Sequence, residues 1–318
     1  MKTAIVGLGV IGKVHERVLE ELGTPAACAC DILEEEIARY GEHGYRNFSE
    51  MLEKEKPQIV HICTPHYLHA EMVIEALKKG VNVLCEKPLC IRREEIERIL
   101  EAERNSSARL GVCFQNRYNP STIFAKELLK DKKIRTAHGK LFWHRDAAYY
   151  AQAAWRGKKE TEGGGVLVNQ AIHTLDLLQL FCGMPNAVTA YCQNLSLQGV
   201  IEVEDTVRML CVGERQFSLF ATNAAKVERP VEIAFTTDDG QRIRLVQDGV
   251  FVDEKYIDCS TAPGYGKRVY GSGHGNLIAD FHDCIKTGRR FEINGEEGAK
   301  AVKIMLAAYE SDGKEIQI

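Results

Sequence analysis

Short apolar runs alternate with segments that carry one apolar face over the first 115 residues of the chain. The runs predict β-strands at 3–8, 25–30, 58–65, 81–88 and 108–115. Between them, apolar residues recur at helical spacing, as Ile11, Val14, Val18 and Leu22 do, and this predicts helices at 11–22, 34–41, 67–80 and 92–104. Such alternation is typical of a parallel sheet covered on both faces by helices.

The pattern changes after residue 119, where a helix at 122–130 is followed by a longer helical segment at 169–183. Strand patterns then follow one another at 187–195, 205–212, 216–222, 231–237, 242–247 and 249–253. The dipeptides Asp239-Gly240 and Asp248-Gly249 are typical of hairpin turns, and two helices, near 275–287 and 296–310, close the chain. We therefore expect an α/β domain at 1–119 and an α+β domain at 120–318 with a large, mostly antiparallel open sheet.

Composition excludes several classes of partner. The chain of 318 residues has a net charge of −4 and no long basic run, which argues against nucleic-acid binding. No apolar stretch approaches the ~18–20 residues that span a bilayer, and the chain enters a strand directly, so neither a membrane segment nor a signal peptide is expected. Eleven scattered cysteines without a C-x-x-C pair indicate buried free thiols in a reducing cytoplasm rather than disulfides or a metal cluster.

A glycine-rich turn joins the first predicted strand to the first helix. Its residues are Gly7, Gly9, Val10, Ile11 and Gly12, and this spacing between a strand and a helix is typical of dinucleotide binding, with the pyrophosphate at the helix N-terminus. Asp31 ends the second strand about 20 residues later, where a carboxylate binds the ribose hydroxyls. The alternatives are a purely structural turn and an Asp31 that caps the next helix.

The residue at position 31 also bears on the choice of cofactor. Its carboxylate would repel a 2′-phosphate, and Ile32 and Leu33 offer no cation to pair one. We therefore expect NAD, with NADP as a second possibility.

Four further segments carry unusual polar or glycine-rich patterns: 63–70 and 85–88, which end the third and fourth strands, the loop 155–165, and the helix start 169–176. In order and spacing the chain resembles the Gfo/Idh/MocA family, named after glucose–fructose oxidoreductase and inositol dehydrogenase, with a Rossmann domain for NAD(P). The resemblance covers nearly the whole chain and rests on Gly7-x-Gly9-x-x-Gly12, Thr64-Pro65-x-x-x-His69, Glu86-Lys87-Pro88, Arg117-Tyr118, Gly163-Gly164-Gly165 and His173-x-x-Asp176.

The resemblance implies two catalytic residues. Lys87 would reach the substrate hydroxyl beside the nicotinamide, with Pro88 in cis, and His173 would act with it, either residue taking the proton. Asn169 stands where family members commonly carry an aspartate, and an amide can hydrogen-bond a hydroxyl but cannot act as a base. The cofactor side is expected to include Thr64, Pro65, His69, Glu86, Lys87 and Asn116.

The chemistry of alcohol oxidation supports these residue types independently. The cofactor takes only the hydride, so the protein must supply a base for the hydroxyl proton. A lysine with an ordinary pKa of ~10.4 becomes an adequate base when burial and the cationic nicotinamide lower its pKa, and histidine already titrates near neutral pH.

Further substrate contacts are expected from Trp155, Arg156, Tyr150, Asn169 and Asp176. The competing interpretations are that Trp155 packs between domains and that Asp176 orients His173 or caps backbone. His173-x-x-Asp176 lacks a third ligand at suitable spacing, so no metal is expected.

Together these features predict an NAD-dependent oxidoreductase that acts on a secondary hydroxyl of a sugar, inositol or related polyol. One alternative is an NAD-dependent glycosidase that oxidises its substrate transiently and then eliminates. The other is a non-catalytic nucleotide sensor, disfavoured because Lys87 is present. The exposed face of the second sheet would pair copies into a homodimer or homotetramer.

Overall fold

The computed structural model describes residues 1–260 and 271–318, and the chain forms two compact units. The first unit comprises Met1–Gln115 and, in its described part, residues 271–299. The second comprises Asn116–Pro263, described to residue 260, and Lys300–Ile318. The units therefore differ from the predicted continuous domains 1–119 and 120–318, because a late stretch of chain groups with the first unit.

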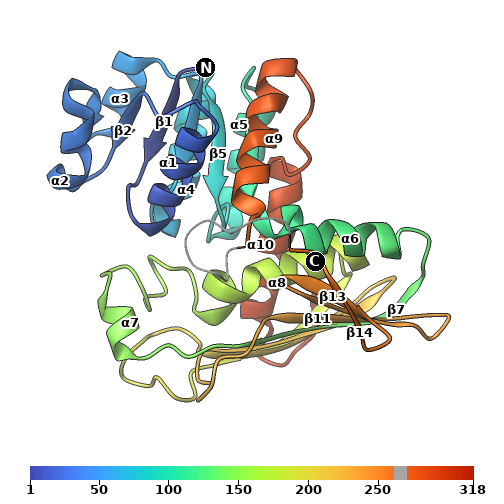
Figure 1. Cartoon of the computed structure of the whole chain (residues 1–318). Coiled ribbons are helices and arrows are strands. Elements are labelled where there is room, and N and C mark those ends of the chain that lie inside the picture. The colour runs from blue at the N-terminus through green and yellow to red at the C-terminus, as the bar shows by residue number, and fades with distance from the viewer. Residues whose placement is uncertain (261–270) are drawn as a thin grey trace. The chain divides into compact units, whose positions relative to one another are not determined.

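The first unit is built on a six-stranded parallel sheet with the order β3-β2-β1-β4-β5-β6 (Figure 1). Its strands are β1 (Thr3–Val6), β2 (Cys28–Cys30), β3 (Gly44–Tyr45), β4 (Ile59–Ile62), β5 (Asn82–Glu86) and β6 (Leu110–Cys113). The strand order reverses between β1 and β4, and right-handed crossovers then place helices on both faces. This parallel sheet confirms the predicted Rossmann-like fold.

Helices of this unit are α1 (Val10–Glu21), α2 (Glu34–Ile37), α3 (Phe48–Glu55), α4 (His69–Lys78), α5 (Arg93–Arg104), α9 (Gly273–Thr287) and the start of α10 (Gly295–Ser311), with short 3₁₀ segments at Ala38–His43 and His66–Leu68. α1 contacts α9, and α4 contacts both α3 and α5. The strands between them are almost wholly buried, as expected when helices cover both faces of a sheet.

Two elements of this unit were not predicted. β3 has only two residues, which is too short for any periodic signal. α3 did carry a signal, because Asn47 caps it by accepting a hydrogen bond from the backbone N–H of Glu50.

The second unit is built on a nine-stranded sheet with the order β14-β13-β12-β11-β7-β10-β9-β8-β15. All neighbouring pairs are antiparallel except β7 and β10, which are parallel. The strands are β7 (Ile134–Phe142), β8 (Ala187–Gln193), β9 (Thr206–Val212), β10 (Gln216–Thr222), β11 (Glu232–Thr237), β12 (Arg242–Val246), β13 (Gly249–Val252), β14 (Lys255–Asp258) and β15 (Ile316–Gln317). The predicted mostly antiparallel sheet is thus confirmed.

Helices cover one face of this sheet. α8 (Ile172–Cys182) packs on β7 and β10, and α6 (Pro120–Leu129) packs on β12 and β13. The approach of α8 is close at Gly139, where a Cβ would lie 2.6 Å from a methyl group of Thr174. A short helix, α7 (Ala147–Ala151), a 3₁₀ turn at Gln115–Tyr118 and the π-helical turn η4 (Leu167–Ala171) complete the unit.

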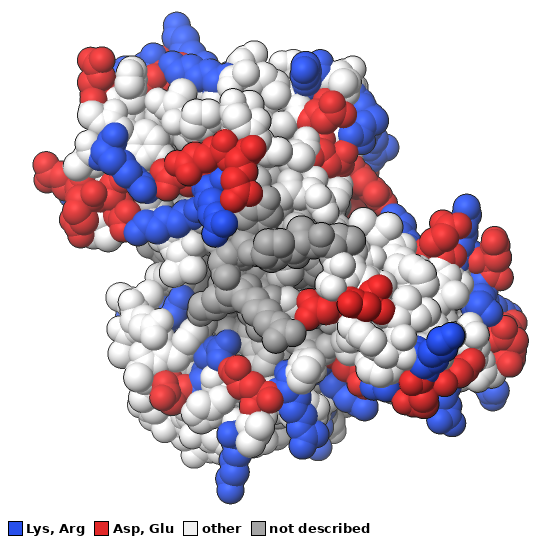
Figure 2. Space-filling view, in the orientation of Figure 1, with Lys and Arg blue, Asp and Glu red and all other residues white. Residues whose placement is uncertain are grey.

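The structure shows the charged side chains on one face and the state of the cysteines directly. Lys and Arg are interspersed with Asp and Glu over the face shown in Figure 2, and the described residues on that face form no extended basic patch. All eleven cysteines lie in the described ranges; they are free thiols, and nine of them are buried. Within the same ranges, no helix has the length and apolar character needed to cross a membrane.

Candidate active site

The glycine-rich turn has two glycines that packing requires and one that faces open space. A Cβ on Gly7, whose φ is +86°, would lie 2.6 Å from the carbonyl oxygen of Cys63, and one on Gly12 would lie 2.0 Å from the carbonyl oxygen of Gly7. A Cβ on Gly9 would meet no atom within 4 Å. The turn is therefore tight on its inner side, while its outer side lets a ligand approach the backbone.

The N-terminus of α1 follows this turn. Gly9 is the N-cap residue, no side chain caps the helix, and its first turn holds no acidic residue. Val10 is 62% exposed. The first N–H groups and the positive end of the helix dipole thus offer a site for an anion such as a pyrophosphate.

Asp31 connects the end of β2 to the glycine-rich turn. One carboxylate oxygen accepts a hydrogen bond from the backbone N–H of Leu8 (2.6 Å), and the other accepts one from Leu33 (2.9 Å). Leu33, not Asp31, is the N-cap of α2, so the helix-cap alternative is wrong. The exposed side chains beside it, Ile32 and Leu33, are apolar, which suits a ribose with a free 2′-hydroxyl.

His69 holds the ends of β4 and β5 together. It is fully buried, its Nδ1 lies 2.7 Å from the carbonyl oxygen of Pro88, and its Nε2 lies 2.8 Å from that of Thr64. Burial, together with the charge on Lys87, lowers the pKa of this imidazole. His69 therefore positions the Thr64-Pro65 turn and the Lys87-Pro88 peptide, which is cis as the resemblance implied.

Glu86 is buried beside Lys87 and bonded to protein groups. Its Oε2 accepts a hydrogen bond from the backbone N–H of Lys87 (3.2 Å), and its Oε1 lies 3.0 Å from His15 Nε2. Burial acts to raise the pKa of this carboxyl, but the hydrogen bond with His15 and the nearby imidazole of His274 hold it well below its usual range. An ionised Glu86 thus anchors the backbone of Lys87, whose side chain is half-buried at the carboxyl edge of the sheet.

In the second unit, Asn169 and His173 lie four residues apart at the junction of η4 and α8. Both side chains are half-buried. A spacing of four residues places them on one side of the helix, and a π-helical turn inside a helix is frequently found at functional sites.

Glu162, which the sequence did not single out, contacts the candidate site residue Asn169. Its side chain is 1% exposed, and it accepts hydrogen bonds from the backbone N–H of Gly157 (2.5 Å) and from the amide of Asn169. Burial raises its pKa to about 7. The only signal was a glutamate inside a glycine-rich loop, which by itself is typical of a solvated side chain.

A second buried acid, Glu204, holds the other side of the glycine-rich loop. It accepts hydrogen bonds from the backbone N–H groups of Gly165 (2.9 Å) and Leu167 (2.9 Å) and from the hydroxyl of Tyr309 (3.0 Å). Two buried carboxyl groups from outside the helix thus accept hydrogen bonds from η4, Glu204 at Leu167 and Glu162 at Asn169.

Two expected substrate contacts are corrected by the structure. Asp176 is fully buried, and its carboxylate forms a bidentate pair with Arg117 at 2.7 and 2.5 Å. Tyr150 is 6% exposed in an apolar cluster with Leu197 and Ile201. Both side chains are buried inside the second unit and are not available to a substrate. The sequence alone could not show that Asp176 pairs with Arg117 or that the ring of Tyr150 packs in an apolar cluster.

The remaining expected contacts lie on the same unit. The guanidinium of Arg156 lies 4.5 Å from the ring centre of Tyr149 and 5.6 Å from that of Trp155. Trp155 and Arg156 are half-buried, and so is Asn116, which accepts hydrogen bonds from Asn119. These side chains are accessible in part, and their roles stay predictions.

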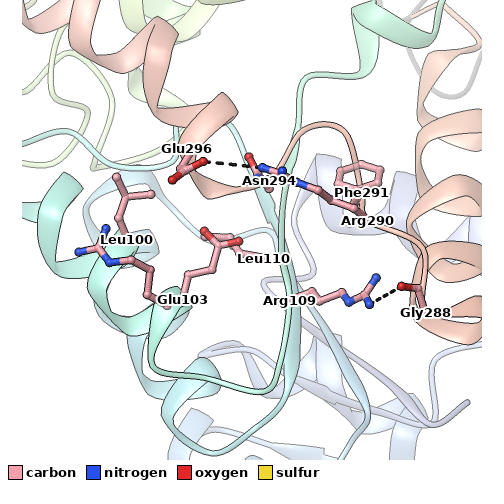
Figure 3. Close-up of a pocket in the computed structure, with 10 residues that line it drawn as sticks. Leu100, Glu103, Arg109, Leu110, Gly288, Arg290, Phe291, Asn294 and Glu296 are labelled. Atoms are coloured by element: carbon pink, nitrogen blue, oxygen red, sulfur yellow. Dashed lines mark hydrogen bonds and ion pairs between the residues drawn. The ribbon is translucent and has the colours of Figure 1, made fainter.

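A pocket of about 400 Å³ lies elsewhere on the first unit (Figure 3). It is at the amino end of β6, whereas a Rossmann sheet binds its cofactor at the carboxyl ends. The guanidinium of Arg109 reaches the carbonyl oxygen of Gly288 (2.6 Å), and Arg290 pairs with Glu296 (3.7 Å). Its polar groups therefore serve mainly to end α9 and begin α10.

Family models match both units. Residues 1–114 match the model of an oxidoreductase family with an NAD-binding Rossmann fold, and residues 124–245 match the GFO/IDH/MocA C-terminal domain.

Curated relatives include the putative oxidoreductase YteT of Bacillus subtilis (31% identical over 159 residues, 49% of this chain). Others are the myo-inositol 2-dehydrogenase of Thermotoga maritima (26%, 58%) and the levoglucosan dehydrogenase of Pseudarthrobacter phenanthrenivorans (26%, 60%). These alignments span 37%, 55% and 53% of the relatives' own lengths.

Solved structures match over the whole chain. The WlbA dehydrogenase from Bordetella pertussis, crystallised with NADH and UDP-GlcNAcA, is 26% identical with a TM-score of 0.87, covering 100% of this chain and 98% of that one. A levoglucosan dehydrogenase in complex with NADH and levoglucosan has the same TM-score at 21% identity, covering 100% and 99%, and shows the common fold.

Proposed function

The chain belongs to the Gfo/Idh/MocA family of NAD-binding oxidoreductases, and from this premise we propose that it transfers a hydride between a secondary hydroxyl of a sugar, inositol or related polyol and NAD. The substrates named for its relatives are inositol, levoglucosan and a UDP-sugar acid. All are carbohydrates or cyclic polyols with secondary hydroxyl groups, which supports this substrate class.

One observation carries the proposal most directly: the lysine at the carboxyl end of β5 is positioned by two buried groups. Glu86 accepts a hydrogen bond from its backbone N–H, and His69 bonds the carbonyl of the following Pro88. The backbone of a solvated surface lysine would not need these two buried contacts. The fixed backbone therefore favours a catalytic role for Lys87, in which its ammonium group must be held at one defined position.

The cofactor, when bound, supplies the acceptor for the hydride. The chain supplies the rest of the chemistry: the glycine-rich turn and Asp31 bind and orient the dinucleotide, and Lys87 and His173 act as the acid/base pair for the hydroxyl proton. Asn169 hydrogen-bonds a substrate hydroxyl, and Glu162 orients the Asn169 amide through the hydrogen bond that it accepts.

The test is a panel of inositols, monosaccharides, anhydrosugars and UDP-sugars, each offered with NAD⁺ and with NADP⁺ while reduced cofactor is followed by absorbance. We expect net NADH formation with at least one class. Accumulation of a cleaved glycoside without net NADH would instead identify the glycosidase reaction.

Removing either member of the acid/base pair should cut turnover of the accepted substrate. Lys87→Ala and His173→Ala should each lower kcat by at least ~10²-fold, the usual scale for a lost acid/base group. Lys78→Ala, an exposed lysine at the end of α4, is the matched control. Near-normal turnover in both variants would contradict the assignment.

We also propose that the chain self-associates through the outer face of its nine-stranded sheet. α6 and α8 cover the inner face, whereas the outer face presents Tyr191 and Leu210, each 47% exposed. Exposed large apolar side chains on a broad sheet face favour a homodimer, or a homotetramer built from it.

A further inference from the structure

Four metal-ligating side chains from four different elements meet inside the first unit. They are His15 of α1, Glu86 at the end of β5, Cys113 at the end of β6 and His274 of α9. All four are buried, with exposures of 0 to 5%. No part of the proposed reaction uses His15, Cys113 or His274.

The distances in this cluster match those between the ligands of one small cation. One ligand atom from each residue lies within 4.8 Å of the other three. His15 Nε2 and His274 Nε2 lie 3.0 and 3.7 Å from Glu86 Oε1, and Cys113 Sγ lies 3.9 Å from His15 Nε2. Tetrahedral zinc with bonds of about 2.1 Å to N or O and 2.3 Å to S separates its ligand atoms by about 3.4–3.6 Å, so side-chain shifts of under an ångström complete the site.

The donor set also suits zinc in kind and in charge. Imidazole nitrogen, thiolate sulfur and carboxylate oxygen are the ligands that Zn²⁺ takes in proteins. One thiolate and one carboxylate together carry two negative charges. A bound Zn²⁺ therefore leaves the buried cluster neutral, which avoids the large cost of an isolated charge in the interior.

Two further histidines orient the first ligand. His15 Nδ1 lies 2.9 Å from His61 Nδ1, and His61 Nε2 lies 3.0 Å from His282 Nε2. With His15 bound to a metal through Nε2, its Nδ1–H donates to His61, whose Nε2–H in turn donates to His282. Each of the ring nitrogens that these two contacts join then has a consistent role as donor or acceptor, as is usual for the outer partners of metal-ligating histidines.

We propose that His15, Glu86, Cys113 and His274 bind one structural Zn²⁺ ion. The site joins α1, which follows the glycine-rich turn, to the residue before Lys87, and it holds the ends of β5 and β6 against α9. Glu86 connects the site to the proposed reaction through the backbone N–H of Lys87, but the ligands include neither Lys87 nor any group assigned to the substrate. The sequence offered no hint of it, since the four ligands are 71, 27 and 161 residues apart along the chain.

The first experiment measures metal in the whole chain. The chain, expressed in medium with added zinc and purified without chelator, should contain about one zinc ion per chain by elemental mass spectrometry. After removal of metal under conditions in which the chain stays folded, Co²⁺ should give the thiolate charge-transfer absorption and the strong visible bands of a four-coordinate site. A wild-type chain that binds neither ion would overturn the proposal and leave the cluster a hydrogen-bonded network only.

Variants then test the ligand set. Cys113→Ala and His274→Ala should lose the bound zinc, and zinc should raise the melting temperature of the wild type but not of these variants. Cys90→Ala, a fully buried thiol of the same unit outside the cluster, is the matched control and should keep its metal. Equal zinc content in Cys113→Ala and the wild type would overturn the assignment. If Cys113→Ala fails to fold, the thiolate–cobalt absorption of the wild type still decides the question.

Discussion

At the scale of single residues, we propose that the carboxylate of Asp31 governs which dinucleotide the chain accepts. It is anchored by backbone N–H groups on two sides, so its position does not depend on the ligand. Asp31→Asn keeps the size of the side chain, removes the charge and replaces one of the two accepting oxygens with an NH2 donor. We expect it to weaken NADH binding by about tenfold, because hydrogen bonds to a charged group are worth about 1.5–3 kcal/mol, and to strengthen NADPH binding.

Fluorescence titration of the two reduced cofactors measures this change. Glu34→Gln, an exposed acid in the first turn of α2, is the control. An unaltered ratio of the two dissociation constants in Asp31→Asn would remove Asp31 from the cofactor site.

Glu162 should make the stability of the chain depend on pH. Its pKa rises from 4.5 to about 7 in the folded chain, because the side chain is buried. Between these values the folded state binds more protons than the unfolded state, so the free energy of unfolding falls as pH rises from about 4.5 to 7 and is level outside that window. The total contribution of this group is about 3 kcal/mol.

Urea unfolding at several pH values measures this effect. Glu162→Gln should lose this share of the pH dependence and become the more stable chain above pH 7. Glu160→Gln, an exposed neighbour, should follow the wild type. The same pH dependence in Glu162→Gln and the wild type would show that the carboxyl ionises freely.

At the scale of elements, different glycines of the turn between β1 and α1 serve folding and cofactor binding. Gly9 has φ −66°, which alanine adopts readily, and open space beside it. Gly9→Ala should therefore fold with wild-type stability yet bind NADH weakly, because the methyl group occupies the approach to the pyrophosphate. Gly12→Ala places its Cβ against a backbone carbonyl and should lose about 1–3 kcal/mol of stability.

Thermal unfolding and NADH titration on the two variants check this contrast. Equal NADH affinity in Gly9→Ala and the wild type would mean that the turn serves only the fold.

Elements with a strong period were predicted well, and short or context-dependent ones were not. α1, α5, α9 and α10 lie within a few residues of the expected helices, and β8 to β13 match the expected strands. The segment at 169–183 was expected as one regular helix, but it begins with a π-helical turn. The acids that hydrogen-bond to that turn, Glu204 and Glu162, lie outside it in the sequence, so no local pattern reveals these contacts.

At the scale of the whole molecule, the outer face of the nine-stranded sheet decides the oligomeric state that we propose. Leu210 faces solvent from β9, between the buried Met209 and Cys211. Leu210→Lys should shift the chain from dimer or tetramer toward monomer while leaving the monomer folded, because no core contact is lost. Light scattering coupled to size-exclusion chromatography measures the mass.

Ile123→Lys is the matched control, since Ile123 is 53% exposed on α6 and lies off the outer face. A Leu210→Lys chain that keeps the wild-type mass would show that copies do not associate through this face.

The sequence by itself determined the fold class, the glycine-rich turn and the position of Asp31. Each of these is a local pattern, in which a few neighbouring residues must satisfy one backbone geometry or one periodicity. The family motifs likewise pointed to Lys87, His173 and Asn169 as candidates for the chemistry.

Only the tertiary structure decided which polar side chains are buried and paired within the protein and which stay accessible to a substrate or cofactor. Asp176 pairs with Arg117, which is 59 residues away in the sequence. Glu162 accepts a hydrogen bond from the amide of Asn169. His15 and His274, from α1 and α9, lie in one cluster inside the first unit. Burial and hydrogen-bond satisfaction depend on every element that closes around a group, and that neighbourhood is a property of the folded chain alone.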